Sequence, residues 1–196
     1  MPRQYEIHHW VLLTALFPRG RLDPIPLLWV CIGTHTCSVN FNFYRFRSHW
    51  PLRASLQDVY AVLEDVESYP DWWPEIRVAR RIDSDSGSMR VRSRLPYDLN
   101  FTLTRTRRDP AAGVLEARME GDLEGFSRWT LTRSGELTLA DFQEEVEVNR
   151  PLLKRLAPIA WPAFRANHRL MMHNGHRGLQ TYLAGYARAT GRAQAS

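Results

Sequence analysis

The chain has 196 residues, of which 44% are hydrophobic, and its formal net charge at pH 7 is +5. This length and apolar content suffice for one sizeable core, so we expect one domain with an additional segment. The positive charge is almost wholly arginine, and basic residues alternate with acidic ones along the predicted strands, which argues against a nucleic-acid-binding surface. The two cysteines, Cys31 and Cys37, match no metal-binding or redox spacing.

Residues 1–40 form a leader that differs from the rest of the chain. Its two apolar pieces, Trp10–Phe17 and Ile25–Ile32, are each shorter than the ~18 residues of a membrane-spanning helix. No clear signal-peptide cleavage site follows the first piece. We expect this leader to be poorly ordered, or absent if translation starts at Val39, and the folded domain to cover residues 41–196. Alternatively, the apolar pieces dock on the domain or touch a membrane.

The first regular elements are predicted just after the leader. The segment FNFYRFRSHW alternates aromatic and polar residues, which is the pattern of a half-buried strand. Ser55 followed by Asp58 is a capping-box start, and apolar residues then recur at helical spacing. The segment YPDWWP predicts a second short helix or turn between its two prolines. It carries Trp72 and Trp73, which we expect to point in different directions because they are adjacent.

The stretch from residue 75 to residue 149 is a run of strand-like segments separated by turn signals. The predicted strands are 75–83, 88–96, 97–108, 114–122, 126–135 and 136–149. Their order predicts an antiparallel sheet of sequential hairpins with one solvated face. In the last strand Glu144 interrupts a row of otherwise mostly apolar residues that faces the core. A register shifted by one residue would instead place Glu144 outside.

The last long helical run, from about Pro162 to Ala189, is amphipathic. Its apolar residues fall within a band roughly 120° wide on a helical wheel, which requires a broad apolar partner. The members of this band are Phe164, Met171, Met172, Leu179, Tyr182, Leu183 and Tyr186. His168 projects near the middle of the band, and Gly175 lies on the same face.

Prolines and glycines interrupt the C-terminal helical pattern. Pro151, Pro158 and Pro162 predict short helical pieces ahead of the long run and no continuous helix. Gly175 and Gly178 each cost a helix up to about 1 kcal/mol relative to alanine. On the inward face, Gly175 either enlarges a cavity or lets a strand approach closely.

His168 and Glu144 are the candidate catalytic residues. An imidazole on the buried face of the helix can hydrogen-bond a ligand carbonyl or exchange a proton near neutral pH. The alternative is a structural histidine in the core that hydrogen-bonds a side chain or backbone group of a strand. If Glu144 also faces inward, it pairs with His168 and orients the imidazole, since an inward carboxylate is costly without a partner. His173 and His176 project away from the apolar face or at its rim, so we expect no three-histidine metal site.

Several strings in this order resemble a known superfamily. They are PLRAS ahead of VYAVLEDVESYPDWWP, the strand piece WTL, and NHRLMMHNGHRGL in the final helix. Together they resemble the SRPBCC superfamily (START-like, Bet v 1-like), and most closely its bacterial polyketide cyclase/dehydrase or lipid-transport-like members, over about residues 41–189. The resemblance implies an α+β helix-grip fold. A curved antiparallel sheet of about seven strands would wrap the C-terminal helix, with two short helices after the first strand.

In such proteins the space between the sheet and the helix holds an apolar ligand. Core packing is the better explanation for any one of the large apolar residues on the predicted inner faces, but together they would suit an adaptable site. The candidate ligand-binding residues are Trp73, Phe101, Trp129, Phe142, Phe164, His168, Met171, Met172 and Gly175.

The leading hypothesis is a bacterial cytoplasmic protein that binds or transports a hydrophobic small molecule such as a lipid, an isoprenoid or a polyketide-like aromatic. The alternative is a polyketide aromatase/cyclase in which His168 and Glu144 promote enolisation and dehydration. A partner-binding regulator that uses the arginine-rich strand faces is a third class. The sequence carries no phosphate-binding glycine loop, zinc spacing or nucleophile signature. We expect no cofactor or metal, no nucleic acid and no stable membrane insertion, and the oligomeric state stays open.

Overall fold

The structure, a computed structural model, describes residues 29–32, 36–39, 42–92, 97–189 and 191. Its elements are the strands β1 (Trp29–Ile32), β2 (Thr36–Val39) and β3 (Phe43–Leu52), the helices α1 (Leu56–Glu64), η1 (Val66–Ser68) and α2 (Tyr69–Trp72), the strands β4 (Ile76–Arg81), β5 (Ser86–Arg92), β6 (Asp98–Asp109), β7 (Val114–Gly121), β8 (Leu123–Ser134) and β9 (Leu137–Val148), and the helix α3 (Pro151–Ala189). Most of the predicted leader lies outside the described residues. Its described part forms a separate two-stranded sheet of β1 and β2.

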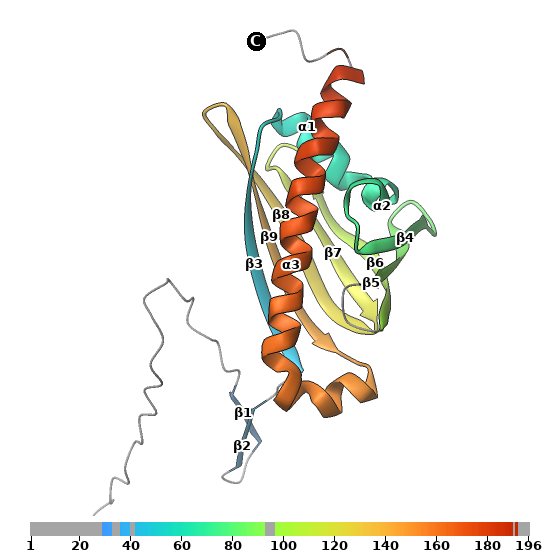
Figure 1. Ribbon diagram of the computed structural model, residues 1–196, viewed down its shortest axis with the longest axis vertical. Coiled ribbons are helices and arrows are strands. Elements are labelled where there is room, and N and C mark those ends of the chain that lie inside the picture. Colours follow the sequence, from blue (N-terminus) through green and yellow to red (C-terminus); the bar gives the residue numbers. More distant parts are fainter. Residues whose placement is uncertain (1–28, 33–35, 40–41, 93–96, 190, 192–196) are drawn as a thin grey trace, which may run out of the picture.

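One seven-stranded antiparallel sheet carries the fold. Its strand order is β3-β9-β8-β7-β6-β5-β4, so every neighbouring pair except β3 and β9 is consecutive in the chain. The long helix α3 runs across one face of this curved sheet, and α1 and α2 lie at the end where α3 finishes (Figure 1). This arrangement confirms the predicted α+β helix-grip fold and the predicted run of hairpins.

The elements before β4 follow local sequence signals. Ser55 caps α1, because its hydroxyl oxygen accepts a hydrogen bond from the amide of Asp58 at 3.1 Å. Alternation in β3 buries Tyr44 and Trp50 and exposes the arginines between them. The adjacent side chains of Trp72 and Trp73 are both buried. The chain turns at Trp73 into an extended conformation, and the two indoles stack with centroids 5.4 Å apart.

Helix α3 is longer than predicted. It begins at Pro151 and continues to Ala189, so the expectation of separate short pieces before Pro162 was wrong. Pro151 occupies the first turn, where a missing amide hydrogen costs nothing. Pro158 and Pro162 each remove one hydrogen bond inside the helix, which bends a helix without ending it. Figure 1 shows this bend, since the first part of α3 runs at a steep angle to the rest.

The solid part of the core lies at the α1–α2 end of the sheet. Leu179 and Leu183 of α3 are fully buried there against Leu52, Val59 and Leu63, which are also buried. The opposite, N-terminal half of α3 leaves space above the sheet, and this is where the candidate site lies. Within the described residues, no helix is both long enough and apolar enough to cross a membrane.

Candidate ligand-binding site

A cavity of about 250 Å³ lies between the sheet and α3. Its walls are mainly apolar and come from α2, α3 and strands β3 to β9. Eight of the nine residues predicted to bind a ligand line it, namely Trp73, Phe101, Trp129, Phe142, Phe164, His168, Met171 and Met172. The structure thus brings together side chains that are up to a hundred residues apart in the chain.

A layer of aromatic rings separates this cavity from the solid core. Trp129 packs against Phe142 with ring centroids 4.6 Å apart and against Trp50 at 4.8 Å. Trp73 meets the edge of Trp50 at 5.6 Å, and its indole nitrogen donates a hydrogen bond to the carbonyl of Met171 at 3.0 Å. Because these rings contact one another, they form a packed aromatic floor for the cavity.

Gly175, the ninth predicted residue, does not line the cavity. A Cβ atom at Gly175 would lie 2.6 Å from the indole of Trp73, and one at Gly178 would lie 1.7 Å from the carbonyl oxygen of Trp72. The two glycines therefore form a notch in α3 that receives the Trp72–Trp73 segment. From the sequence, Gly175 was expected either to enlarge a cavity or to let a strand approach closely. In the structure it instead lets the C-terminal end of α2, Trp72 and Trp73, approach α3.

His168 and Glu144 meet inside the molecule. The Nε2 atom of His168 lies 3.0 Å from the Oε2 atom of Glu144, and their side chains are 16% and 11% exposed. Phe46 of β3 covers the imidazole, with parallel rings and centroids 3.5 Å apart. When Nε2–H donates to the carboxylate, Nδ1 is left as the atom that exchanges a proton, since no partner for it is found among the described residues. The geometry supports an acid–base couple or a fixed hydrogen-bonding site.

Tyr44 adds a polar group to the same end of the cavity. Its side chain is 3% exposed and lines the cavity, and its hydroxyl has no hydrogen-bond partner in the described part of the chain. Burial, and secondarily the nearby Tyr97, raise the pKa of the Tyr44 phenol to about 12. The phenol therefore stays protonated at neutral pH and is available to a ligand as a donor or an acceptor.

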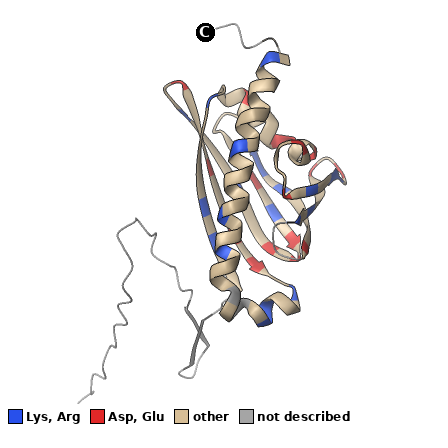
Figure 2. Cartoon of the chain, viewed as in Figure 1, with Lys and Arg blue, Asp and Glu red and all other residues tan. Residues whose placement is uncertain are grey.

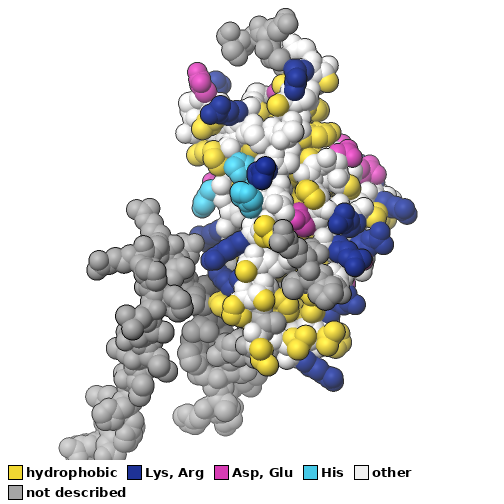
Figure 3. Space-filling model, in the orientation of Figure 1, with side chains coloured by type: hydrophobic (Ala, Val, Ile, Leu, Met, Phe, Trp, Pro, Cys, Tyr) yellow, Lys and Arg dark blue, Asp and Glu magenta, His cyan; other side chains and the backbone are white. Residues whose placement is uncertain are grey.

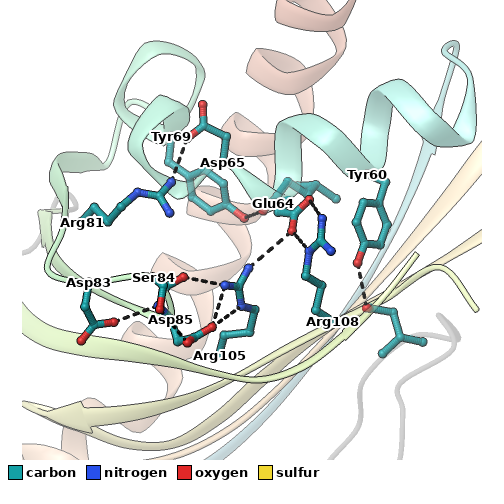
Figure 4. Close-up of polar contacts among 12 residues, drawn as sticks. Tyr60, Glu64, Asp65, Tyr69, Arg81, Asp83, Ser84, Asp85, Arg105 and Arg108 are labelled. Carbon is teal, nitrogen blue, oxygen red and sulfur yellow. Dashed lines mark hydrogen bonds and ion pairs between the residues drawn. The ribbon is translucent and has the colours of Figure 1, made fainter. Parts of the chain in front are cut away.

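Charged residues surround the cavity where it reaches solvent beneath α1. Arg105 of β6 bridges two elements there, donating to Asp85 in the β4–β5 turn at 2.7 Å and to Glu64 of α1 at 3.4 Å (Figure 4). Glu64 also pairs with Arg108. Hydrogen bonds from Arg105, and then from Ser84, hold the pKa of the Asp85 carboxyl below its usual value. These contacts tie α1 to the edge of the sheet.

Sequence reasoning missed this charged opening. Arg105 lies on the same face of β6 as Leu99 and Leu103, because alternate residues of a strand share a face. Its inward position could therefore have been predicted from the sequence. The partners of Arg105 could not have been predicted, because Glu64 lies at the end of a helix and Asp85 lies in a turn, where periodicity does not indicate the direction of a side chain. Alternation in β3 accounts for the burial of Tyr44 beside Trp50, but a hydroxyl without a hydrogen-bond partner cannot be recognised in a sequence.

The remaining histidines of α3 lie apart from His168. His176 bonds the carbonyl oxygen of Pro51 at 3.1 Å and stacks on Trp50, while His173 is exposed. No group of three histidine, cysteine or acidic side chains suited to a metal ion occurs within the residues that the structure describes.

The fold and this cavity define a class of protein, the helix-grip proteins in which a curved sheet and a long C-terminal helix surround an internal space. Residues 52–174 match the family described as polyketide cyclase/dehydrase and lipid transport, and the chain belongs to that family. No sequence among the curated proteins matches the chain.

Solved structures share the fold at low sequence identity. The protein TTHA0849 from Thermus thermophilus is 13% identical with a TM-score of 0.65, covering 74% of this chain and 99% of its own. The Zhui aromatase/cyclase from Streptomyces sp. R1128 is 16% identical with a TM-score of 0.62, covering 76% and 98%. A START superfamily protein from Mycobacterium smegmatis is 18% identical with a TM-score of 0.58, covering 72% and 98%. At these identities the likeness concerns the fold alone.

Proposed function

We propose that this chain is a cytoplasmic binding or transport protein for a hydrophobic small molecule that carries one or two oxygen functions, such as a lipid, an isoprenoid or a polyketide-like aromatic. The observation that carries the proposal is the cavity, whose apolar walls hold a cluster of polar groups at one end. An apolar volume with a few polar groups is the usual form of a small-molecule site. The apolar walls would bind the body of the ligand, and Tyr44 and His168 would bind its oxygen atoms.

Native mass spectrometry of the full chain purified from its own host tests this proposal directly. A retained apolar molecule at one copy per chain is the expected result. Titration with a fluorescent fatty acid gives a second measurement, because the probe becomes brighter in an apolar site. A chain that carries no ligand from its host and does not bind the probe would contradict the proposal.

Filling the cavity is expected to abolish this binding. Ala117 of β7 lines the cavity, so Ala117→Phe places a phenyl ring inside it and weakens probe binding by about tenfold or more. Ala166→Phe is the matched control, because Ala166 lies on the exposed face of α3. Thermal unfolding of both variants shows whether each is folded. Equal binding by the two folded variants would mean that the probe binds elsewhere.

The second candidate function is that of a polyketide aromatase/cyclase. The contact between His168 and Glu144 favours it, because an imidazole held by a carboxylate can take a proton from carbon next to a carbonyl and return it to a leaving hydroxyl. His168→Ala should abolish the cyclisation of a poly-β-ketone substrate, whereas His173→Ala on the exposed face should not. Unchanged product formation by a folded His168→Ala variant would count decisively against this function.

A further inference from the structure

The first turns of α3 present an apolar stripe to solvent. Leu152, Leu156 and Ile159 are 67%, 44% and 86% exposed, and their spacing places them on one face of the helix. Ile82, at the far edge of the sheet, is the other large apolar side chain with this exposure among the residues described. Figure 3 shows hydrophobic side chains gathered at the end of the molecule where α3 begins. Monomeric proteins usually bury such a cluster or use it.

The same part of the helix is basic. Arg150 directly precedes the helix, Lys154 and Arg155 lie in its first turns, and no acidic residue follows Glu147 in the chain. Lys154 lies 3.6 Å from Glu147, whereas Arg155, beside the apolar stripe, has no ion-pair partner in the described part of the chain. Figure 2 shows the basic residues of this end on the helix, with the acidic ones on the sheet. An exposed apolar stripe with cations beside it matches a helix that lies in the interface of an anionic membrane.

We propose that the first part of α3, residues 151–159, docks the protein on an anionic membrane surface. Leu152, Leu156 and Ile159 enter the boundary between headgroups and acyl chains, and Arg155 contacts lipid phosphates. The bend in α3 supports this orientation, because it allows the first turns to lie flat while the rest of the helix stays on the sheet (Figure 1). Three side chains provide a small apolar area, so the attachment is peripheral and reversible.

The docked face adjoins the cavity. Leu153, one residue after Leu152 and therefore about 100° further round the helix, is 5% exposed and lines the cavity. The first part of α3 is therefore the wall between the proposed membrane surface and the proposed ligand. Transfer of a ligand from the membrane into the cavity through this part of α3 would rest on the proposed function. The membrane docking does not depend on the proposed function.

Charge argues against a second copy of the chain as the occupant of the stripe. A two-fold interface through Leu152 and Ile159 would bring the cations of two helices together without acidic partners from either helix. An anionic bilayer supplies the opposite charge instead. Analytical ultracentrifugation of the full chain, with residues 1–28 present, measures self-association directly.

Sedimentation of the full chain with vesicles tests the docking. Binding is expected to phosphatidylcholine–phosphatidylglycerol vesicles, to be weak on phosphatidylcholine alone, and to decrease with added salt. The triple variant L152S/L156S/I159S should lower the partition coefficient by roughly tenfold or more, and Arg155→Glu should lower it on anionic vesicles only. Ile82→Ser and Arg90→Glu are the matched controls, since both residues are exposed on other parts of the surface.

Three outcomes would overturn the proposal. The full chain fails to bind anionic vesicles, the triple variant binds as the Ile82→Ser control does, or analytical ultracentrifugation shows a dimer that only the triple variant dissociates. The fluorescent fatty-acid titration separates this proposal from the proposed function. The triple variant should retain cavity binding in solution, and loss of cavity binding in Ala117→Phe should leave vesicle binding intact.

Discussion

Gly178→Ala is expected to lower the free energy of unfolding by about 3 kcal/mol or more. The new Cβ atom would lie 1.7 Å from the carbonyl oxygen of Trp72. Both atoms belong to rigid parts of the backbone or are bonded directly to it, so no side-chain rotation relieves the overlap. Either α3 moves away from α2 or the turn at Trp72 rearranges.

Gly185→Ala is the matched control for this experiment. Gly185 lies two turns further along the same helix, and nothing lies within 4 Å of the position that its Cβ would take. Alanine there should raise stability by up to about 1 kcal/mol, because alanine is the better helix former. Urea unfolding followed by far-UV circular dichroism measures both variants. Similar stabilities for the two variants would show that Gly178 does not receive Trp72.

Gly175→Ala should produce a smaller loss of stability and a larger change in the site. Its Cβ would lie 2.6 Å from the indole of Trp73, a side chain that can shift. Since Trp73 lines the cavity and packs on Trp50, that shift moves the aromatic floor. The glycine notch thus connects the packing of α2 on α3 to the shape of the ligand-binding space.

The fold was predictable because two periodicities divide this sequence cleanly. Alternation in β3 to β9 indicates which face of the sheet is buried, and the wide apolar band indicates which face of α3 is buried. The fold then follows from packing one main sheet against one long helix. The start of α3 was not predictable by the same means. Pro158 and Pro162 weaken a helix locally, but the neighbouring turns hold it together, so the prolines bend the helix where the sequence alone suggested a break.

The candidate site was predictable only in part, and for a related reason. Periodicity placed Glu144 and His168 on inward faces of two different elements, and the helix-grip topology brings those faces together. Contacts that depend on turns and helix ends could not be obtained this way. Asp85 reaches Arg105 through the conformation of the β4–β5 turn, and the Gly178 contact depends on where α2 ends.

His168→Leu is expected to lower the free energy of unfolding at neutral pH by about 3 kcal/mol, because it leaves the Glu144 carboxylate largely buried without its partner. The loss should come from the unpaired charge more than from the lost hydrogen bond. A second change that removes the charge, Glu144→Gln, should therefore recover most of the stability in the double variant. Glu144→Gln alone should cost about 1 kcal/mol, since the amide oxygen still accepts a hydrogen bond from the imidazole.

A double-mutant cycle measured by urea unfolding gives the coupling between the two side chains. His173→Leu, on the exposed face of α3, controls for the general effect of replacing a histidine and should change stability by no more than about 0.5 kcal/mol. Additive effects of the two changes would show that the carboxylate finds water or another donor when His168 is absent. Glu144 would then no longer qualify as a residue that orients the imidazole, and the acid–base role of the pair would lose its structural basis.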